Sequence, residues 1–124
     1  MDSLERTERA LAGQNPSRLV RPSSGIARLT TRELLRERGY TLVVGSAYTS
    51  DCTNPPRSYM RWAFKQMLEP GRILILHDGR KERQRTVDVL PFVLEEARAQ
   101  GLEPVTVSHL LRGARRNERT DAVD

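Results

Sequence analysis

The residues of this chain with the clearest chemical potential end an aliphatic run at positions 73–80, which reads ILILHDGR. His77 and Asp78 follow four aliphatic residues there. A histidine next to a carboxylate is the smallest unit of general acid–base chemistry, because the carboxylate fixes the tautomer while the imidazole transfers the proton. The same residues could instead cap a strand or form a surface pair, and the run by itself leaves both interpretations open.

The elements that must position these residues follow a repeating order. Short apolar or β-branched runs predict strands at residues 17–22, 40–46, 72–77 and 103–107. Helical spacing with start and stop signals predicts helices at residues 3–12, from Thr30 to Gly39, from Asn54 to Pro70, and from Thr86 to Gly101. The side chains of Thr30, Asn54 and Thr86 are the predicted caps at the starts of the last three helices. This alternation favours right-handed βαβ units, and therefore an α/β fold with a parallel sheet.

Ligands of parallel α/β sheets bind beyond the carboxyl ends of the strands. The first predicted strand ends at Arg21, the second leads to Asp51, and the third ends at His77. We therefore expect an arginine, a carboxylate and a histidine to gather at one edge of the sheet.

Length and charge fit one small domain. The chain has 124 residues, a net charge of +5 and a pI of about 10.1, which could indicate an acidic partner such as nucleic acid or a membrane surface. The arginines are mixed with acidic residues and form no lysine-rich block, as is typical of solvated helix faces. We expect no signal peptide in the charged N-terminus, no membrane span, and no localisation signal that names a compartment.

The sequence predicts no metal or nucleotide site. Cys52 is the one cysteine, which excludes an intrachain disulfide, and no cysteine or histidine lies near it in the sequence. His77 and His109 lack the spacing of metal ligands. The glycines form no phosphate-binding array. Residues 113–124 show no apolar period, and we expect a disordered tail there.

Over residues 5–112, approximately, the chain resembles the C-terminal half of the polysaccharide deacetylases, the NodB-homology family that includes chitin and peptidoglycan deacetylases. RPSSG (21–25) resembles the third motif of the family, SAYTSD (46–51) lies where the fourth motif ends in an aspartate, and ILILHD (73–78) closely resembles the fifth. The resemblance implies a partial, half distorted β/α barrel within residues 1–112, with about four parallel strands alternating with helices.

The resemblance also implies metal-assisted hydrolysis of N-acetyl groups on glycans, in which a divalent ion, usually zinc, polarises the carbonyl and activates water. His77 would be the general acid that protonates the leaving amine, Asp51 would orient His77, and Arg21 would position the catalytic base. The implied substrate contacts are a loop of Pro22, Ser23, Ser24 and Gly25, the acetyl-methyl pocket residue Ile75, and Cys52.

Two family motifs are absent. One is Thr-Phe-Asp-Asp, which supplies the base and a metal-binding aspartate, and the other is a pair of metal-binding histidines one helical turn apart. Residues 1–20 contain no histidine. Ser23 and Ser24 replace a proline and an aromatic residue, and Cys52 stands where a tryptophan often follows the fourth-motif aspartate. We expect no metal bound by this chain and no deacetylase activity from it alone.

Three functions stay open. The chain could be part of a deacetylase that is complete only with a missing N-terminal half or with another chain. It could be a non-catalytic carbohydrate-binding remnant. It could also be a basic nucleic-acid-binding module, since Arg32, Arg36 and Arg38 form a basic helix face, although helix-turn-helix spacing is missing. Half a barrel would leave a strand edge unpaired, which favours self-association through residues 40–46 or 20–24.

Overall fold

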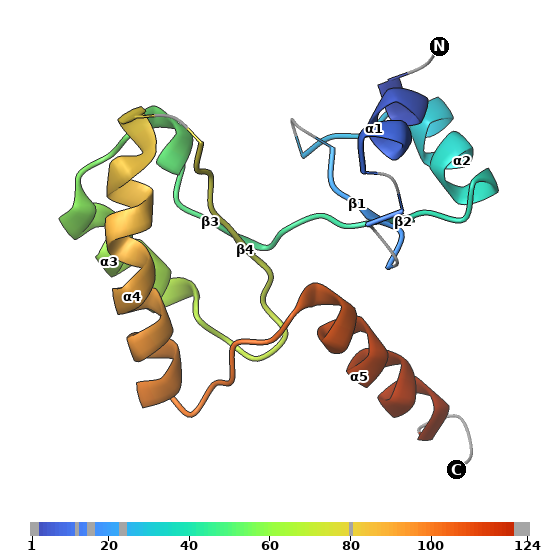
Figure 1. Cartoon of the computed structure of the whole chain (residues 1–124). Coiled ribbons are helices and arrows are strands. Elements are labelled where there is room, and N and C mark those ends of the chain that lie inside the picture. Colours follow the sequence, from blue (N-terminus) through green and yellow to red (C-terminus); the bar gives the residue numbers. More distant parts are fainter. Residues whose placement is uncertain (1–2, 12, 15–16, 23–24, 80, 121–124) are drawn as a thin grey trace. The chain divides into compact units, whose positions relative to one another are not determined.

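The computed structural model describes residues 3–11, 13–14, 17–22, 25–79 and 81–120 (Figure 1). The chain divides into two compact units, Met1–Val44 and Gly45–Asp124. Each unit contains one pair of short parallel strands among its described residues. The fold is therefore mixed α/β, and the predicted site residues are divided between the units.

The first unit is a strand–helix–strand arrangement preceded by a helix. Its elements are α1 (Ser3–Leu11), β1 (Leu19–Val20), α2 (Leu29–Glu37) and β2 (Thr41–Leu42). The strands pair in parallel, with Leu19 opposite Thr41. The Tyr40 hydroxyl donates to Glu8 Oε1 over 2.7 Å, and the Arg18 guanidinium lies 4.5 Å from the centroid of the Tyr40 ring. These contacts tie α1 to the residues that lead into each strand.

The second unit contains the other pair of strands and the longest helices. Its elements are β3 (Ala47–Tyr48), a 3-10 turn (Asp51–Thr53), α3 (Arg57–Met67), β4 (Leu74–Ile75), a second 3-10 turn (Lys81–Arg83), α4 (Gln84–Ala99) and α5 (Val107–Thr120). Strands β3 and β4 pair in parallel, with Tyr48 opposite Ile75. Helices α3 and α4 lie side by side in Figure 1.

The core of the second unit lies between α3 and α4. Met60 and Phe64 on α3, with Val89 and Val93 on α4, are at most 2% exposed. Each pair is four residues apart, which places both side chains on one face of its helix. Partly buried side chains extend this core to β4, namely Leu68, Leu74, Leu76 and Phe92. The packing holds β4 against the two helices.

Two strand predictions are wrong, one in its length and one in its existence. The predicted strand at 40–46 is interrupted, because β2 ends at Leu42 and the chain passes through half-exposed Val44 into the second unit. The predicted strand at 103–107 does not form in the described chain, since residues 102–106 have no strand pairing and α5 begins at Val107. Pro104 lacks the N–H that a strand ladder needs.

The prediction of a disordered tail at 113–124 differs from the structure. Helix α5 continues to Thr120, and residues 121–124 lie outside the described residues. Its first turns carry apolar residues three and four apart, and the arginines that follow are good helix formers. None of the helices in the described ranges has both the length and the apolar character needed to cross a bilayer.

The predicted side-chain caps are also wrong. Thr30 lies inside α2, Asn54 precedes α3 in a left-handed conformation, and Thr86 lies inside α4. No side-chain hydrogen bond caps the start of α2, α3 or α4. Capping residue types were therefore present near these helix starts without fixing the first helical residue.

Close approach of β3 and β4 makes Gly45 sensitive to substitution. A Cβ at Gly45 would overlap the Ile75 side chain, whereas a Cβ at Gly113 in α5 would meet nothing within 4 Å. We expect Gly45→Ala to lower the free energy of unfolding by about 1–3 kcal/mol through overpacking. The matched control Gly113→Ala should instead raise it by roughly 0.5–1 kcal/mol, because alanine favours helix. Urea denaturation of both variants measures this, and equal effects would contradict the packing argument.

Candidate functional site

The 3-10 turn after β3 points Asp51 into the protein. Ser50 and Asn54 bracket the turn with φ values of 53° and 55°, in the left-handed region. Such backbone costs about 1–3 kcal/mol per non-glycine residue and persists only where the surroundings fix it. The Thr53 hydroxyl donates to the Ser50 carbonyl over 2.8 Å and closes the turn. As a result, Asp51 is only 1% exposed.

The buried Asp51 carboxylate accepts three hydrogen bonds from described residues. His77 Nδ1 lies 2.8 Å from Oδ1, the His77 backbone N–H donates to Oδ2 over 2.6 Å, and the Thr86 hydroxyl donates to Oδ2 over 3.2 Å. A buried carboxylate is costly unless such donors replace its water. The end of β4 and the first turn of α4 therefore both converge on one side chain.

The structure fixes the orientation of the His77 ring. Because a carboxylate only accepts hydrogen bonds, Nδ1 must carry a proton, which leaves Nε2 as the atom free to exchange one. The side chain is 29% exposed, and no described residue hydrogen-bonds Nε2. Asp78, the sequence neighbour, is exposed, so the partner of His77 is Asp51. This geometry favours the acid–base interpretation of the run at 73–80 over a surface pair with Asp78.

Tyr48 forms one wall beside His77. The two rings meet edge to face, with centroids 6.0 Å apart and an interplanar angle of 74°. The Tyr48 hydroxyl and the Cys52 sulfur lie 2.6 Å apart. This hydrogen bond, followed by burial and the negative charge of Asp51, raises the pKa of the Tyr48 hydroxyl above its ordinary value. A neutral phenol therefore stands next to the imidazole.

The arrangement can hold an imidazole and move a proton at Nε2. Cys52 pairs with Tyr48, and within the described ranges no hydrogen bond links the thiol to His77, so the geometry shows no thiol–imidazole nucleophile. Across the described part of the chain, no group of three or more histidine, cysteine, aspartate or glutamate side chains could hold a metal ion. The residues present do not fit the zinc that the resemblance implies.

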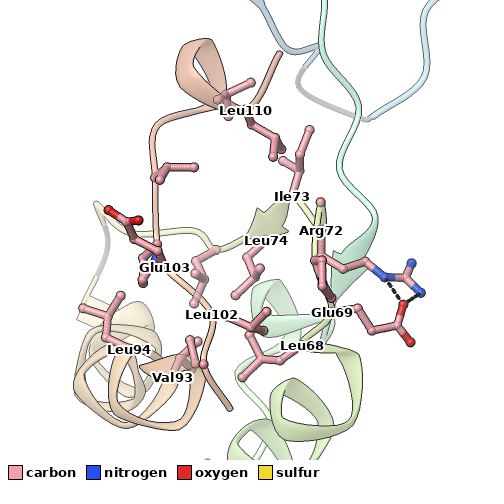
Figure 2. A pocket seen from close by; sticks show the side chains of 18 of the residues that line it. Leu68, Glu69, Arg72, Ile73, Leu74, Val93, Leu94, Leu102, Glu103 and Leu110 are labelled. Atoms are coloured by element: carbon pink, nitrogen blue, oxygen red, sulfur yellow. Dashed lines mark hydrogen bonds and ion pairs between the residues drawn. The ribbon is translucent and has the colours of Figure 1, made fainter. Parts of the chain in front are cut away.

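A separate cavity of 560 Å³ lies in the second unit. Figure 2 shows its aliphatic wall, with Leu74 from β4, Val93 and Leu94 from α4, and Leu102 from the segment after α4. At its rim Arg72 is paired with Glu69 over 2.7 Å. Neither His77 nor Asp51 lines this cavity, so it is not the proton-transfer site.

Comparison with known proteins identifies a relative of the chain. Over 96 residues it is 34% identical to a peptidoglycan-N-acetylglucosamine deacetylase of Bacillus cereus, a match that covers 76% of this chain. These findings support its resemblance to the polysaccharide deacetylase family. It spans 45% of the Bacillus deacetylase, about half its length. A comparison with protein-family models found no match.

The fold of the chain is also seen in a solved structure. It resembles a family 4 carbohydrate esterase from Streptomyces lividans in complex with acetate, with a TM-score of 0.71 and 24% identity. The similarity covers 83% of this chain and 53% of the esterase. At this identity the likeness establishes the fold alone, as mixed α/β.

The family-motif residues fall into two groups. The second unit contains His77, Asp51, Ile75 and Cys52. In it, Ile75 is part-buried and Cys52 is exposed. The third-motif residues lie in the first unit. Arg21 is exposed, Pro22 is half-buried, and the Gly25 N–H donates to the Pro22 carbonyl over 3.0 Å. The other two predicted loop residues, Ser23 and Ser24, lie outside the described residues.

Gly25 has a φ of +72°, a left-handed conformation that favours glycine and closes the loop after Pro22. A Cβ at this position would lie 4.0 Å from Arg21 Nη2, so the guanidinium lies over the loop. The structure thus joins Arg21 to its own motif and joins Asp51 to His77. It does not show the two groups together.

Sequence reasoning missed two residues of this site. Thr86 was assigned to a helix cap, yet positions 86, 89, 93 and 97 are spaced as one helix face, and all four residues are buried. That spacing was the signal for Thr86. Tyr48 carried no comparable signal, because only the register of β3 against β4 brings it near His77.

The Thr86 hydroxyl should support the site without touching substrate. We expect Thr86→Val to lower the free energy of unfolding by about 1–3 kcal/mol, since Asp51 stays buried with one donor fewer. The His77 backbone N–H donates to the same Asp51 oxygen as Thr86. Loss of the Thr86 hydroxyl should therefore move the His77 amide resonance in the NMR spectrum. Thr86→Ser is the matched control, because it keeps the hydroxyl and should leave that resonance in place. An unshifted amide in the valine variant would show that the bond contributes nothing to the site.

The Tyr48–Cys52 pair should be visible in a pH titration. We expect Cys52→Ala to move the pKa of Tyr48 down toward its ordinary value, because the first cause of the upward shift is removed. In the native chain the neutral phenol is favoured by folding, so its stabilising effect is present below the ordinary tyrosine pKa and is lost as pH rises through the shifted value. NMR titration of the Tyr48 ring measures this. Identical curves for both proteins would refute the assignment of the shift to Cys52.

Proposed function

We propose that this chain carries the general-acid half of a polysaccharide deacetylase site, which acts in the hydrolysis of N-acetyl groups on a glycan such as chitin or peptidoglycan. The observation that supports this most directly is the His77–Asp51 pair, in which a buried carboxylate holds Nδ1 over 2.8 Å. The unpartnered Nε2 is then the atom that hands a proton to the leaving amine. The name and the identity of the Bacillus relative support the choice of substrate class.

The other family residues take supporting roles in this proposal. Asp51 keeps the ring in one tautomer, and Arg21 positions the catalytic base. Ile75 lines the pocket for the acetyl methyl, while Cys52 borders the substrate beside Tyr48. The loop of Pro22, Ser23, Ser24 and Gly25 borders the substrate, as the family resemblance implies. The turn at Gly25 and the part-buried Ile75 side chain are compatible with these roles.

We propose further that the two parallel strand pairs are portions of one half of a distorted β/α barrel. The parallel registers of β1 with β2 and of β3 with β4 support this arrangement. In a barrel every strand has two neighbours. The exposed strand edges would then pair with the missing half or with a second copy of the chain.

The metal and the base come from outside these 124 residues in this proposal. No ligand set for a divalent ion occurs in the described ranges, and the sequence lacks the Thr-Phe-Asp-Asp and paired-histidine motifs. His77 can supply a proton, and the groups that activate water belong to the two missing motifs. We therefore propose that the chain alone is inactive and is completed by further polypeptide.

A non-catalytic carbohydrate-binding role is the second candidate. The same lack of a described ligand set favours it. It differs from the first proposal in one measurable way, because a remnant would bind glycan but would stay inactive even when the missing motifs are supplied.

Acetate release tests the two candidates. We expect the chain alone, with zinc, to release no acetate from an N-acetylglucosamine hexamer. Fused behind an N-terminal half of the family that carries both missing motifs, it should release acetate, and His77→Ala in the fusion should lower that rate by about 100- to 10,000-fold. His109→Ala is the matched control and should leave the rate unchanged. Acetate release by the chain alone would refute the proposed division of the site, and an inactive fusion would favour the remnant.

A further inference from the structure

Two aromatic side chains stand exposed on α3, and neither is among the contacts of His77 described above. Tyr59 is 45% exposed and Trp62 is 61% exposed. Their ring centroids lie 6.1 Å apart, and the ring planes are tilted by 39°. Large exposed apolar side chains that occur together mark an interaction surface more often than isolated ones do. We define these two residues as the aromatic platform.

The platform is held by a rigid helix. The opposite face of α3 carries Met60 and Phe64, both 0% exposed in the core. Two ion pairs tie α3 to α4, one between Arg57 and Asp88 and another between Lys65 and Glu96 over 3.0 Å. Helix α3 therefore cannot rotate to bury Tyr59 and Trp62 without opening the core.

The polar groups of the two rings are available for hydrogen bonds to a ligand. Among the described residues, neither the Tyr59 hydroxyl nor the Trp62 indole N–H has a hydrogen-bond partner. The neighbouring positions on α3 are polar and exposed, namely Ser58, Arg61, Lys65 and Gln66. Arg61 is itself positioned, with its guanidinium 4.2 Å from the centroid of the Phe92 ring on α4.

This combination suits a sugar chain better than a protein surface. A stable protein interface needs on the order of 1,000 Å² with an apolar centre, and two rings among polar side chains do not provide such a centre. A pyranose ring has an apolar C–H face and a rim of hydroxyl and acetamido groups. The aromatic faces of Tyr59 and Trp62 match the apolar face of the sugar. The hydrogen-bond donors of the two rings and of their polar neighbours match its polar rim.

We propose that the aromatic platform is a second glycan-binding site, which takes neighbouring N-acetylglucosamine units of the chain whose deacetylation is proposed above. This inference rests on the proposed function for its class of ligand. Two rings that are tilted against each other present separate faces to successive sugars. The platform would hold a polymer on the protein independently of the chemistry at His77.

Trp62 is the one tryptophan of the chain, so its fluorescence reports on the platform alone. In the full chain we expect a saturable change in this fluorescence on titration with the N-acetylglucosamine hexamer, together with protection from acrylamide quenching. In glycan-free protein the quencher should reach Trp62 freely. Strong shielding there would mean that protein covers the platform, either another copy or the rest of the chain, and would overturn the proposal.

Variants locate the binding. Tyr59→Ala should weaken the affinity for the hexamer about three- to tenfold, the effect of losing one aromatic stacking partner. Tyr59→Phe should keep most of the affinity. Val87→Ala, which removes an apolar side chain that is 49% exposed on α4, is the matched control and should bind like the native chain. Retention on insoluble chitin tests Trp62→Ala, which has lost the fluorophore and should be retained less.

The outcome is separable from that of the proposed function. His109→Ala, at a residue outside both the platform and the His77 site, should bind the hexamer as tightly as the native chain. Acetate release is measured on the fusion and does not enter this test. Equal binding by Tyr59→Ala and Val87→Ala, or no fluorescence change with the hexamer, would overturn the platform while leaving the deacetylase proposal untouched.

Discussion

The second unit depends on one buried charge. Asp51 is removed from water, and its carboxylate is satisfied by the ring and backbone of His77 and by Thr86. These donors come from the end of β4 and from α4, so the carboxylate fixes where a strand ends relative to a helix. Hydrophobic packing between α3 and α4 has no comparable directionality, because apolar contact tolerates small shifts that a hydrogen bond does not.

This arrangement requires an unfavourable left-handed backbone conformation at Ser50 and Asn54. They turn the backbone sharply after β3, which sends the carboxylate inward instead of along the strand. The His77 imidazole is therefore oriented by the Asp51 carboxylate, which is buried and accepts three hydrogen bonds. Proton transfer needs this kind of rigidity, since a donor must stay aligned while its partner approaches. Among the described residues, no group of three or more histidine, cysteine, aspartate or glutamate side chains could hold a metal ion beside this pair.

Much of this could be predicted from sequence, and the failures have physical causes. The proximity of His77 and Asp51 was expected from two strands that end at one edge of a sheet, whereas the orienting role of Asp51 was implied by the family resemblance. Thr86 was missed because its residue type suggested a cap, although its spacing with Val89 and Val93 placed it on the buried face. The strand expected at 103–107 failed because a β-branched pattern says nothing about whether a neighbouring strand has a free edge in register. The tail expected at 113–124 shows that a polar composition does not by itself prevent a helix.

The way Asp51 is buried has a consequence for how such a protein changes over generations. If His77 were replaced by a residue without a side-chain donor, the carboxylate would stay buried with one partner fewer, and removing the partner of a buried charge is strongly destabilising. Selection for foldability would then preserve the histidine in a lineage that had stopped hydrolysing anything. A histidine that follows a strand and pairs with a buried aspartate can thus persist for structural reasons alone.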